Sequence, residues 1–150
     1  MTEWLDDAQQ SAWRRLITVV ELLPGALDSQ LRRDAELSHF DYFTLAMLSE
    51  APERTLRMTA LAELTHSTLP RLSHVVSRLE ERGYVERAPC PGDRRATNAT
   101  LTAAGWEKVV ASAPGHVGAV RELVFTGLDA TDVADLDRVM AKILAKLGGP

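Results

Sequence analysis

Arginine, serine and histidine are concentrated in two short stretches of the chain. Arg71, Ser73, His74 and Arg78 fall within eight residues, and the pair Arg94-Arg95 follows in a segment rich in proline and glycine. Guanidinium, hydroxyl and imidazole groups are suited to hydrogen bonds with base edges and phosphates, so both stretches are candidates for contact with nucleic acid. The chain contains no nucleophile elbow, phosphate loop or dinucleotide fingerprint, and we therefore expect no enzymatic activity.

The first stretch is predicted to lie on the exposed face of a helix. Apolar residues recur there at the i, i+3, i+4, i+7 spacing of a buried stripe, at Leu72, Val75, Val76 and Leu79. Thr68 is suited to cap the start of this helix, and Gly83 marks its end. A shorter helix over Met58–Thr65 precedes it across a tight polar turn. The residues left facing outward are Pro70, Arg71, Ser73, His74, Ser77 and Arg78.

The second stretch is predicted to be the loop of a β-hairpin. Two β-prone runs, Tyr84–Arg87 and Thr97–Leu101, flank the segment Ala88–Ala96, which contains two prolines and a glycine. The two arginines would lie at the tip of this loop, with Asp93 placed to pair with Arg95. An arginine held at such a tip suits the negative potential of a minor groove. Helix, turn, helix and hairpin together predict a winged helix-turn-helix.

Four short motifs follow one another at fixed spacing across this region. They are Leu61-Ala62-Glu63, the run Leu79–Arg87, Asp93-Arg94-Arg95 and Leu101-Thr102-Ala103-Ala104-Gly105. In this order they resemble the multiple-antibiotic-resistance regulator (MarR) family of winged-helix transcription factors, and the resemblance covers nearly the whole chain. The turn Thr65-His66-Ser67 departs from the family pattern by being more polar.

The resemblance implies a mainly α fold of the α+β winged-helix type, with about six helices and a small antiparallel β-wing. Residues 1–150 would form a single domain of this family, in which residues 37–102 make the DNA-binding lobe. Residues 1–36 and 103–150 would supply the N- and C-terminal helices of a dimerisation domain, which interlock with those of a second copy. Two reading helices would then meet half-sites roughly 34 Å apart in pseudo-palindromic double-stranded DNA.

Helical patterns with capping signals predict four further helices outside the reading region. They are a helix over residues 3–33, a helix over Phe40–Glu50 started by Ser38, a long helix from Thr102 to about Phe125, and a last helix capped by Asp129 and Asp132. A kink or break is expected at Pro24-Gly25 because an interior proline removes a helix hydrogen bond. Residues 54–57 would form a connection or a minor strand against the wing.

Charge is divided unevenly along the chain. The formal net charge is −4, yet the stretch from Arg54 to Thr100 holds eight arginines against five carboxylates, which favours an electrostatic role for this stretch. There is no apolar run near 18 residues and no basic leader with an apolar core, so we expect neither a membrane span nor a signal peptide. The single cysteine, Cys90, fits a reducing cytoplasm.

The residues expected to contact DNA lie on the second helix and the hairpin: Thr68, Leu69, Pro70, Arg71, Ser73, His74, Arg78, Asp93, Arg94 and Arg95. Leu69 would be an exposed apolar residue that can touch a thymine methyl group. Arg82 is a weaker candidate, which can instead pair with Glu80 or Glu81. Cys90 is expected to be inert, because the hairpin arginines are its only evident basic neighbours; the alternative is a redox sensor.

Relatives in this family commonly hold a small, often aromatic effector between the dimer helices and the reader. The residues that would line such a crevice here are Trp13, Leu16, His39, Tyr42 and Phe43. Residues of these types at helical spacing are more often part of a core, which is the alternative. The histidines His39, His66 and His116 are scattered and lack a carboxylate or cysteine at ligand spacing, so we expect neither a metal site nor a cofactor.

Taken with the resemblance, the sequence predicts a sequence-specific, double-stranded-DNA-binding transcription regulator. We expect a homodimeric repressor of nearby genes that is released by a small ligand. The alternative is a winged-helix module for protein interaction or small-molecule binding without specific DNA recognition.

Overall fold

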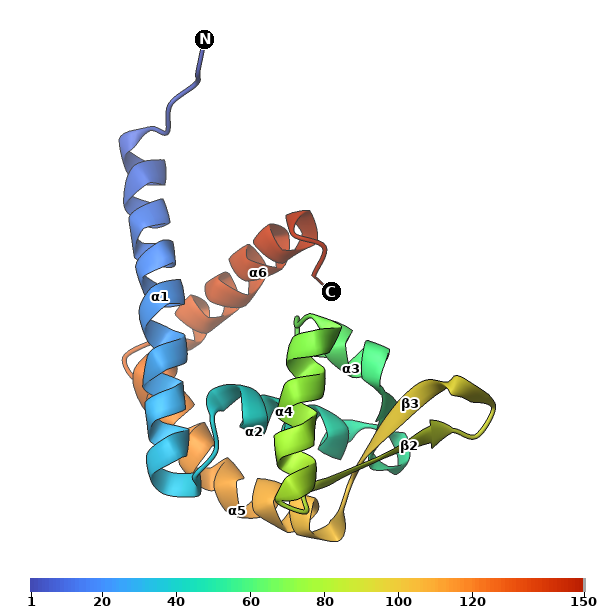
Figure 1. Cartoon of the computed structure of the whole chain (residues 1–150). Helices are drawn as coiled ribbons and strands as arrows, with labels where there is room; N and C mark the ends of the chain where they lie inside the picture. Colours follow the sequence, from blue (N-terminus) through green and yellow to red (C-terminus); the bar gives the residue numbers. More distant parts are fainter. Residues whose placement is uncertain (150) are drawn as a thin grey trace. The chain divides into compact units, whose positions relative to one another are not determined.

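The computed structural model describes residues 1–149 and consists mainly of helices with one small sheet (Figure 1). The helices are α1 Asp7–Ala35, α2 His39–Glu50, α3 Met58–Leu64, α4 Leu69–Glu81, α5 Ala103–Val120 and α6 Ala130–Lys146, with a 3₁₀ turn η1 Pro52–Arg54 and a π turn η2 Arg121–Phe125. The strands are β1 Thr55–Arg57, β2 Val85–Cys90 and β3 Asp93–Leu101. The predicted class, six helices with a small antiparallel sheet, is confirmed.

The chain forms two compact units, Met1–His116 and the part from Val117 onward. The core of the first unit lies where α1 to α4 meet the sheet, and the predicted stripe of α4 belongs to it, with Leu72, Val75, Val76 and Leu79 all buried. Burial of each such side chain stabilises the fold by about 1.5–3 kcal/mol. Among residues 1–149, no helix is long and apolar enough to cross a membrane.

Helix α1 runs without interruption through Pro24, so of the two predicted alternatives, a kink or a break, the break is wrong. The proline removes one backbone hydrogen bond, but the continuous helix carries Leu27 into a buried position further along. Both ends of this continuous helix are also well capped. Asp6 and Gln9 form a capping box at the start, and Glu36 ends the helix in the left-handed conformation. Ser38 caps α2 as predicted: its hydroxyl accepts a hydrogen bond from the backbone N–H of Asp41, and the Asp41 carboxylate accepts one from the backbone N–H of Ser38.

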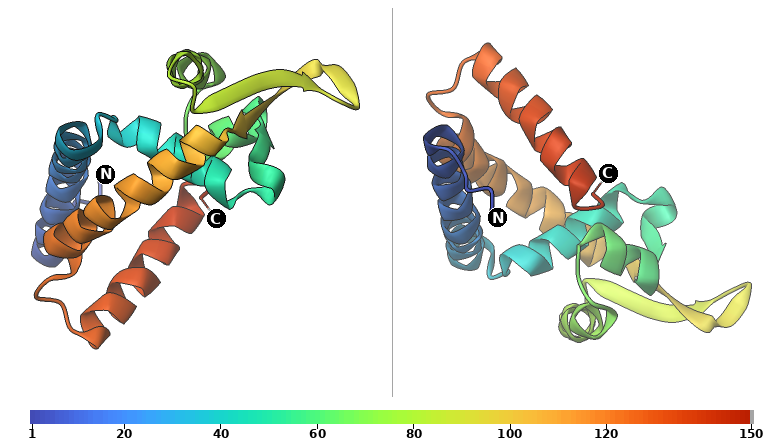
Figure 2. Two further views of the ribbon diagram at one scale, coloured as in Figure 1. Left: turned by 90° about the horizontal axis from the view of Figure 1, so that it is seen from below. Right: turned by 90° about the horizontal axis from the view of Figure 1, so that it is seen from above.

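The sheet has the strand order β1-β3-β2, and both pairings are antiparallel. Thr55–Arg57 is therefore a strand against the wing, one of the two predicted alternatives. The predicted loop Ala88–Ala96 is wrong, because pairing continues to Cys90 and Asp93 and leaves Pro91-Gly92 as the turn. The prolines are tolerated because Pro89 lies on an edge strand, at a register shift. The hairpin consequently projects as a long arm (Figure 2).

In the second unit, Asp129 and Asp132 form the predicted capping box of α6. The predicted helical run to Phe125 is also present, although α5 proper ends at Val120 and the last turn is a π turn. Helix α6 carries a row of half-exposed apolar side chains: Val133, Leu136, Val139 and Leu144. Two of them, Val133 and Leu136, border an apolar groove of about 540 Å³ together with Phe125 and Met140.

Candidate nucleic-acid interface

Helix α4 is amphipathic, with its buried stripe on one side and polar residues on the other. The Thr68 hydroxyl accepts a hydrogen bond from the backbone N–H of Arg71 (3.3 Å), and Pro70 lies in the first turn, where a missing N–H has no cost. Of the residues predicted to contact DNA from this helix, Thr68, Leu69, Pro70, Arg71, His74 and Arg78 are exposed, and Ser73 is half-buried. Of the side chains predicted to face outward on this helix, only Ser73 and Ser77 are half-buried, and the others are exposed.

Helix α2 supports two arginines of the exposed face. The Arg71 guanidinium lies 4.4 Å from the centre of the Phe40 ring, and Arg78 Nη2 lies 3.2 Å from Asp41 Oδ1. Asp41 is itself fixed by the capping box of α2, whereas the Arg78 side chain remains 52% exposed. Both guanidiniums are thus held in place while staying accessible to a ligand, and an orientation fixed in advance reduces the entropy lost on binding.

Arg87 on β2 was not among the predicted site residues, yet it ties the wing to α4. Its guanidinium donates hydrogen bonds to Ser73 Oγ (3.3 Å), Ser77 Oγ (2.8 Å) and Glu80 Oε2 (3.1 Å). The Ser73 hydroxyl is therefore engaged by Arg87. Arg87 ends the motif Leu79–Arg87, but the sequence alone did not indicate which residues it would bind.

The wing holds its predicted residues differently from expectation. Asp93 Oδ1 accepts a hydrogen bond from the backbone N–H of Arg95 (3.0 Å), so the carboxylate shapes the turn and does not pair with the guanidinium. Arg94 and Arg95 are exposed on β3.

Arg82, at the end of α4, donates to the carbonyl oxygen of Glu36 (2.8 Å), so its predicted pairing with a neighbouring glutamate is wrong. Residues one or two positions apart on a helix do not face each other.

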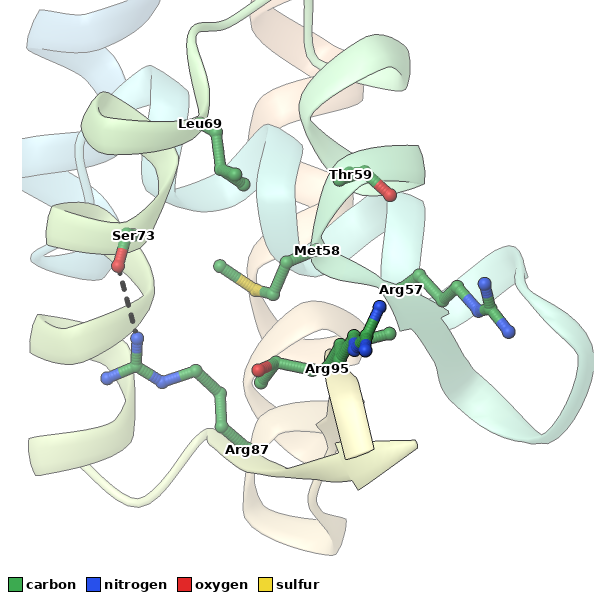
Figure 3. Close-up of a pocket in the computed structure, with 9 residues that line it drawn as sticks. Arg57, Met58, Thr59, Leu69, Ser73, Arg87 and Arg95 are labelled. Atoms are coloured by element: carbon green, nitrogen blue, oxygen red, sulfur yellow. Dashed lines mark hydrogen bonds between the residues drawn. The ribbon is translucent and has the colours of Figure 1, made fainter. Parts of the chain in front are cut away.

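A cavity of about 230 Å³ lies between α4 and the wing (Figure 3). It is lined by Arg57, Met58, Thr59, Leu69, Ser73, Arg87, Arg95, Ala96 and Thr97. Leu69 and Arg95, predicted on separate segments, thereby border one space. Along α4, a second hollow of about 310 Å³ is bordered by Phe40, Arg71, His74 and Arg78. Six of the predicted DNA-contacting residues thus border these two depressions, whereas Thr68, Pro70, Asp93 and Arg94 border neither.

Cys90 has a basic neighbour that the sequence did not reveal. A hydrogen bond from the backbone of Gly92 lowers the pKa of the thiol, and Arg57, whose Nη2 lies 3.6 Å from Sγ, lowers it further. The predicted neighbours, the hairpin arginines, are not the cause. The β1–β3 pairing brings Arg57 to this position from a distant part of the sequence.

The residues predicted to line an effector crevice are only partly grouped. His39 stacks on Phe43 at 6.5 Å between ring centres, and His116 packs against His39 (6.0 Å) and Tyr42 (4.5 Å). The sequence alone indicated no link between His116 and the other histidines, whereas the structure packs it against His39 and Tyr42. Trp13 lies 15 residues before Asp28, the α1 residue that binds the backbone N–H of His39, which corresponds to about 22 Å along the helix. Leu16 lies one turn after Trp13, so neither belongs to the cluster.

Acid should destabilise the fold through this histidine cluster. Burial lowers the pKa of His39 and of His116; His39 adds to the effect on His116, whereas Asp28 opposes it on His39. The unfolded chain then binds protons that the folded chain does not, so stability falls as the pH drops below about 6.5. We expect the free energy of unfolding from denaturant titrations to decrease between pH 7.5 and 5.5. The decrease should be smaller in His116→Gln; an equal decrease in both proteins would contradict this account.

Comparison with known proteins places these features in a family. A sequence model of the MarR family matches residues 38–96. Sco3205 of Streptomyces coelicolor, a MarR family transcriptional regulator solved in complex with DNA, is 44% identical, with a TM-score of 0.92 over 99% of this chain and 93% of that one. AbsC, a MarR family transcriptional regulator of the same organism, is 37% identical, with a TM-score of 0.92 over 99% of this chain and 100% of that one.

A more distant curated relative matches only part of the chain. It is the HTH-type transcriptional regulator YdcH of Bacillus subtilis, which is described as uncharacterized and is 32% identical over 81 residues. The match covers 53% of this chain, and the chain spans about half of that relative's length, 55%.

Proposed function

The chain belongs to the MarR family of transcriptional regulators, and from this premise we propose that it binds double-stranded DNA sequence-specifically as a homodimer and represses nearby genes. The observation that carries the proposal is the positioning of two arginines on α4. Phe40 holds Arg71 and Asp41 holds Arg78, and both arginines remain exposed. A helix with oriented guanidiniums along one face suits the major groove, where arginine reads guanine through two hydrogen bonds.

The site residues divide by role. In the proposed complex, the major groove receives Thr68, Leu69, Pro70, Arg71, Ser73, His74 and Arg78. Arg95 enters the neighbouring minor groove from the wing, Asp93 fixes the turn that presents it, and Arg94 contacts phosphate. Phosphate contacts supply most of the affinity and make it dependent on salt, whereas α4 supplies the specificity.

A second copy of the chain is the proposed partner of the terminal helices. The N-terminal half of α1 exposes Trp13, Val19, Val20 and Leu22, and the second unit carries its own apolar groove beside Phe125. Apolar surface on both sets of helices favours association with a second copy. We assign residues 1–36 and 103–150 to dimerisation and residues 37–102 to DNA binding, with the two reading helices roughly 34 Å apart.

We further propose that the protein acts in the cytoplasm and that a small aromatic effector releases it from DNA. The cluster of His39, Tyr42, Phe43 and His116 supports an effector site, because aromatic rings with a few polar groups suit an apolar ligand. The cluster also joins α2, which supports Arg71 and Arg78, to α1 and α5. A ligand there would shift α4 and alter the separation of the two reading helices.

Selection from a library of random-sequence duplexes tests the proposed function. We expect enrichment of a pseudo-palindromic site whose half-sites are centred about 10 base pairs apart, matching one turn of DNA. Footprinting of the enriched duplex should protect both half-sites together. Recovery of no preferred sequence after repeated rounds would contradict specific recognition and favour a winged-helix module for protein interaction.

A further inference from the structure

His39 and His116 form a pair of imidazole rings where α1, α2 and α5 meet. Their ring centres lie 6.0 Å apart, and Tyr42 packs against His116 at 4.5 Å. Burial lowers the pKa of both histidines, so both rings are neutral at pH 7.5. Burial, with a smaller effect from Glu50, raises the pKa of Tyr42, which therefore stays neutral as well. The pair is consequently the part of this cluster that can change charge between pH 7.5 and 5.5.

A proton on this pair is disfavoured in the packed arrangement. A protonated imidazole carries hydrogen on both nitrogens, and Nδ1 of His116 is buried with no hydrogen-bond partner within residues 1–149. Protonation would therefore leave a buried donor without an acceptor. Two charged rings 6.0 Å apart would also repel each other. Both costs are relieved if the rings separate and water reaches them, so protonation favours a displacement of α2 relative to His116.

Charged groups of α1 lie beside the pair. Oδ1 of Asp28 accepts the backbone N–H of His39 (2.8 Å), and Oδ2 of Asp28 pairs with Arg32 (2.7 Å). Further along α1, Asp34 accepts a hydrogen bond from Gln30 (3.0 Å). The bonds from Arg32 and Gln30 lower the pKa values of these two aspartates, so both carboxylates remain charged at pH 5.5. Asp28 therefore attracts a charged His39 toward α1.

The first turn of α2 also supports the reading helix. Phe40 and Asp41 directly follow His39 in the sequence. Phe40 lies under the Arg71 guanidinium, and Asp41 pairs with Arg78. Residues in one helical turn move together, so a displacement of His39 moves both supports. The two arginines would then lose the orientation that prepares them for DNA.

We propose that His39 and His116 form a proton switch that releases DNA when the pH falls. Protonation displaces the first turn of α2, which frees Arg71 and Arg78 and lowers the affinity of α4 for DNA. This inference rests on the proposed function, to which it adds regulation by protons at the junction of α1, α2 and α5.

Acid acts in the opposite direction on a histidine that touches DNA. His74 lies on the exposed face of α4, where the negative charge of DNA favours its protonated form, so it would strengthen binding as the pH falls. The switch weakens binding, because DNA selects the arrangement in which the pair is neutral. By linkage, DNA binding must then release protons from the pair.

Fluorescence anisotropy at pH 7.5 and 5.5, at constant ionic strength, tests the switch. A histidine that regains its ordinary pKa when displaced, and stays neutral in the complex, lowers the affinity about tenfold over this range. One such histidine in each subunit of a dimer gives roughly a hundredfold loss. We expect His39→Gln and His116→Gln to abolish most of this loss, because glutamine does not titrate. Circular dichroism at pH 5.5 checks that each protein is folded.

His66→Asn is the matched control for these variants. His66 is exposed in the turn between α3 and α4, outside the pair, and asparagine tolerates its left-handed φ of 51°. This variant removes a titratable group of the same type and should keep the full acid effect. An equal acid effect in His116→Gln and His66→Asn would overturn the proposal.

Proton release provides a second readout, which needs no variant. Binding enthalpies measured by calorimetry in two buffers of different ionisation enthalpy give the number of protons exchanged when DNA binds. We expect the wild type to release protons at pH 6.5. Net proton uptake would overturn the proposal, and so would unchanged or tighter binding by the wild type at pH 5.5.

The proposed function fails in a different way. If the wild type prefers no duplex at pH 7.5, specific recognition fails. The freed arginines would still weaken binding to scrambled DNA at pH 5.5, so the switch is read out there. If the wild type prefers the selected duplex and binds it equally tightly at both pH values, the switch alone is contradicted.

Discussion

Arg71→Ala should weaken binding to the selected duplex by about 1–3 kcal/mol, roughly five- to 150-fold, and should weaken binding to scrambled DNA far less. Arg71 lies in the first turns of α4, at the end that enters the groove, and its guanidinium is already oriented by the Phe40 ring 4.4 Å away. Loss of two directed hydrogen bonds to a base removes discrimination as well as affinity. Fluorescence anisotropy with both duplexes measures the two losses separately.

Arg71→Lys is the matched control, because it keeps the charge but loses the planar fork that binds guanine through two hydrogen bonds. We expect it to retain affinity for scrambled DNA and to lose part of the preference for the selected site. Equal weakening of both duplexes by Arg71→Ala would show that Arg71 contacts phosphate only, and base reading would then have to come from Ser73, His74 or Arg78.

Gly105→Ala should destabilise the fold by about 3 kcal/mol. A Cβ added at Gly105 would overlap the carbonyl oxygen of Tyr84 and the side chain of Leu101. This carbonyl also accepts the backbone N–H of Thr102, and the Thr102 hydroxyl bridges Gly83 and the N–H of Gly105. The junction between wing and α5 therefore has little freedom to relax, and we expect a lower midpoint in denaturant unfolding.

Gly25→Ala provides the comparison for this substitution. Gly25 also lies inside a helix, but nothing lies within 4 Å of its added Cβ. Alanine should therefore stabilise α1 there by roughly 0.5–1 kcal/mol. If Gly105→Ala were as stable as Gly25→Ala, the close packing of α5 on the end of the wing would be contradicted.

Features that depend on neighbouring residues were predictable from the sequence. The buried stripe of α4 follows from apolar spacing, and the caps at Ser38, Thr68 and Asp129 follow from residues three positions apart. These signals placed the exposed face of α4 correctly except at Ser73 and Ser77, which are half-buried. The Leu-Thr-x-x-Gly motif was also visible, but its reason, the close approach of Tyr84 and Leu101 to Gly105, emerges only from the packed structure.

Features that depend on pairing between distant segments were not predictable. The loop of the hairpin was expected to begin at Ala88, because prolines normally end strands. Strand pairing instead continues past Pro89 to Cys90 and Asp93. Arg87 meets Ser73 across 14 positions and His39 meets His116 across a far longer separation, so no local pattern joins either pair. The break at Pro24 failed for a related reason: the cost of one hydrogen bond is local, but the gain from burying Leu27 is tertiary.

Fluorescence anisotropy of the wild-type protein with its selected duplex and with a scrambled duplex, at several salt concentrations, tests sequence-specific recognition most directly. We predict that affinity for both duplexes falls as salt rises, since phosphate contacts contribute to each. The selected duplex should nevertheless bind at least about a thousandfold more tightly at physiological salt. Equal affinity for the two duplexes at every salt concentration would contradict the assignment of α4 as a reader of DNA sequence.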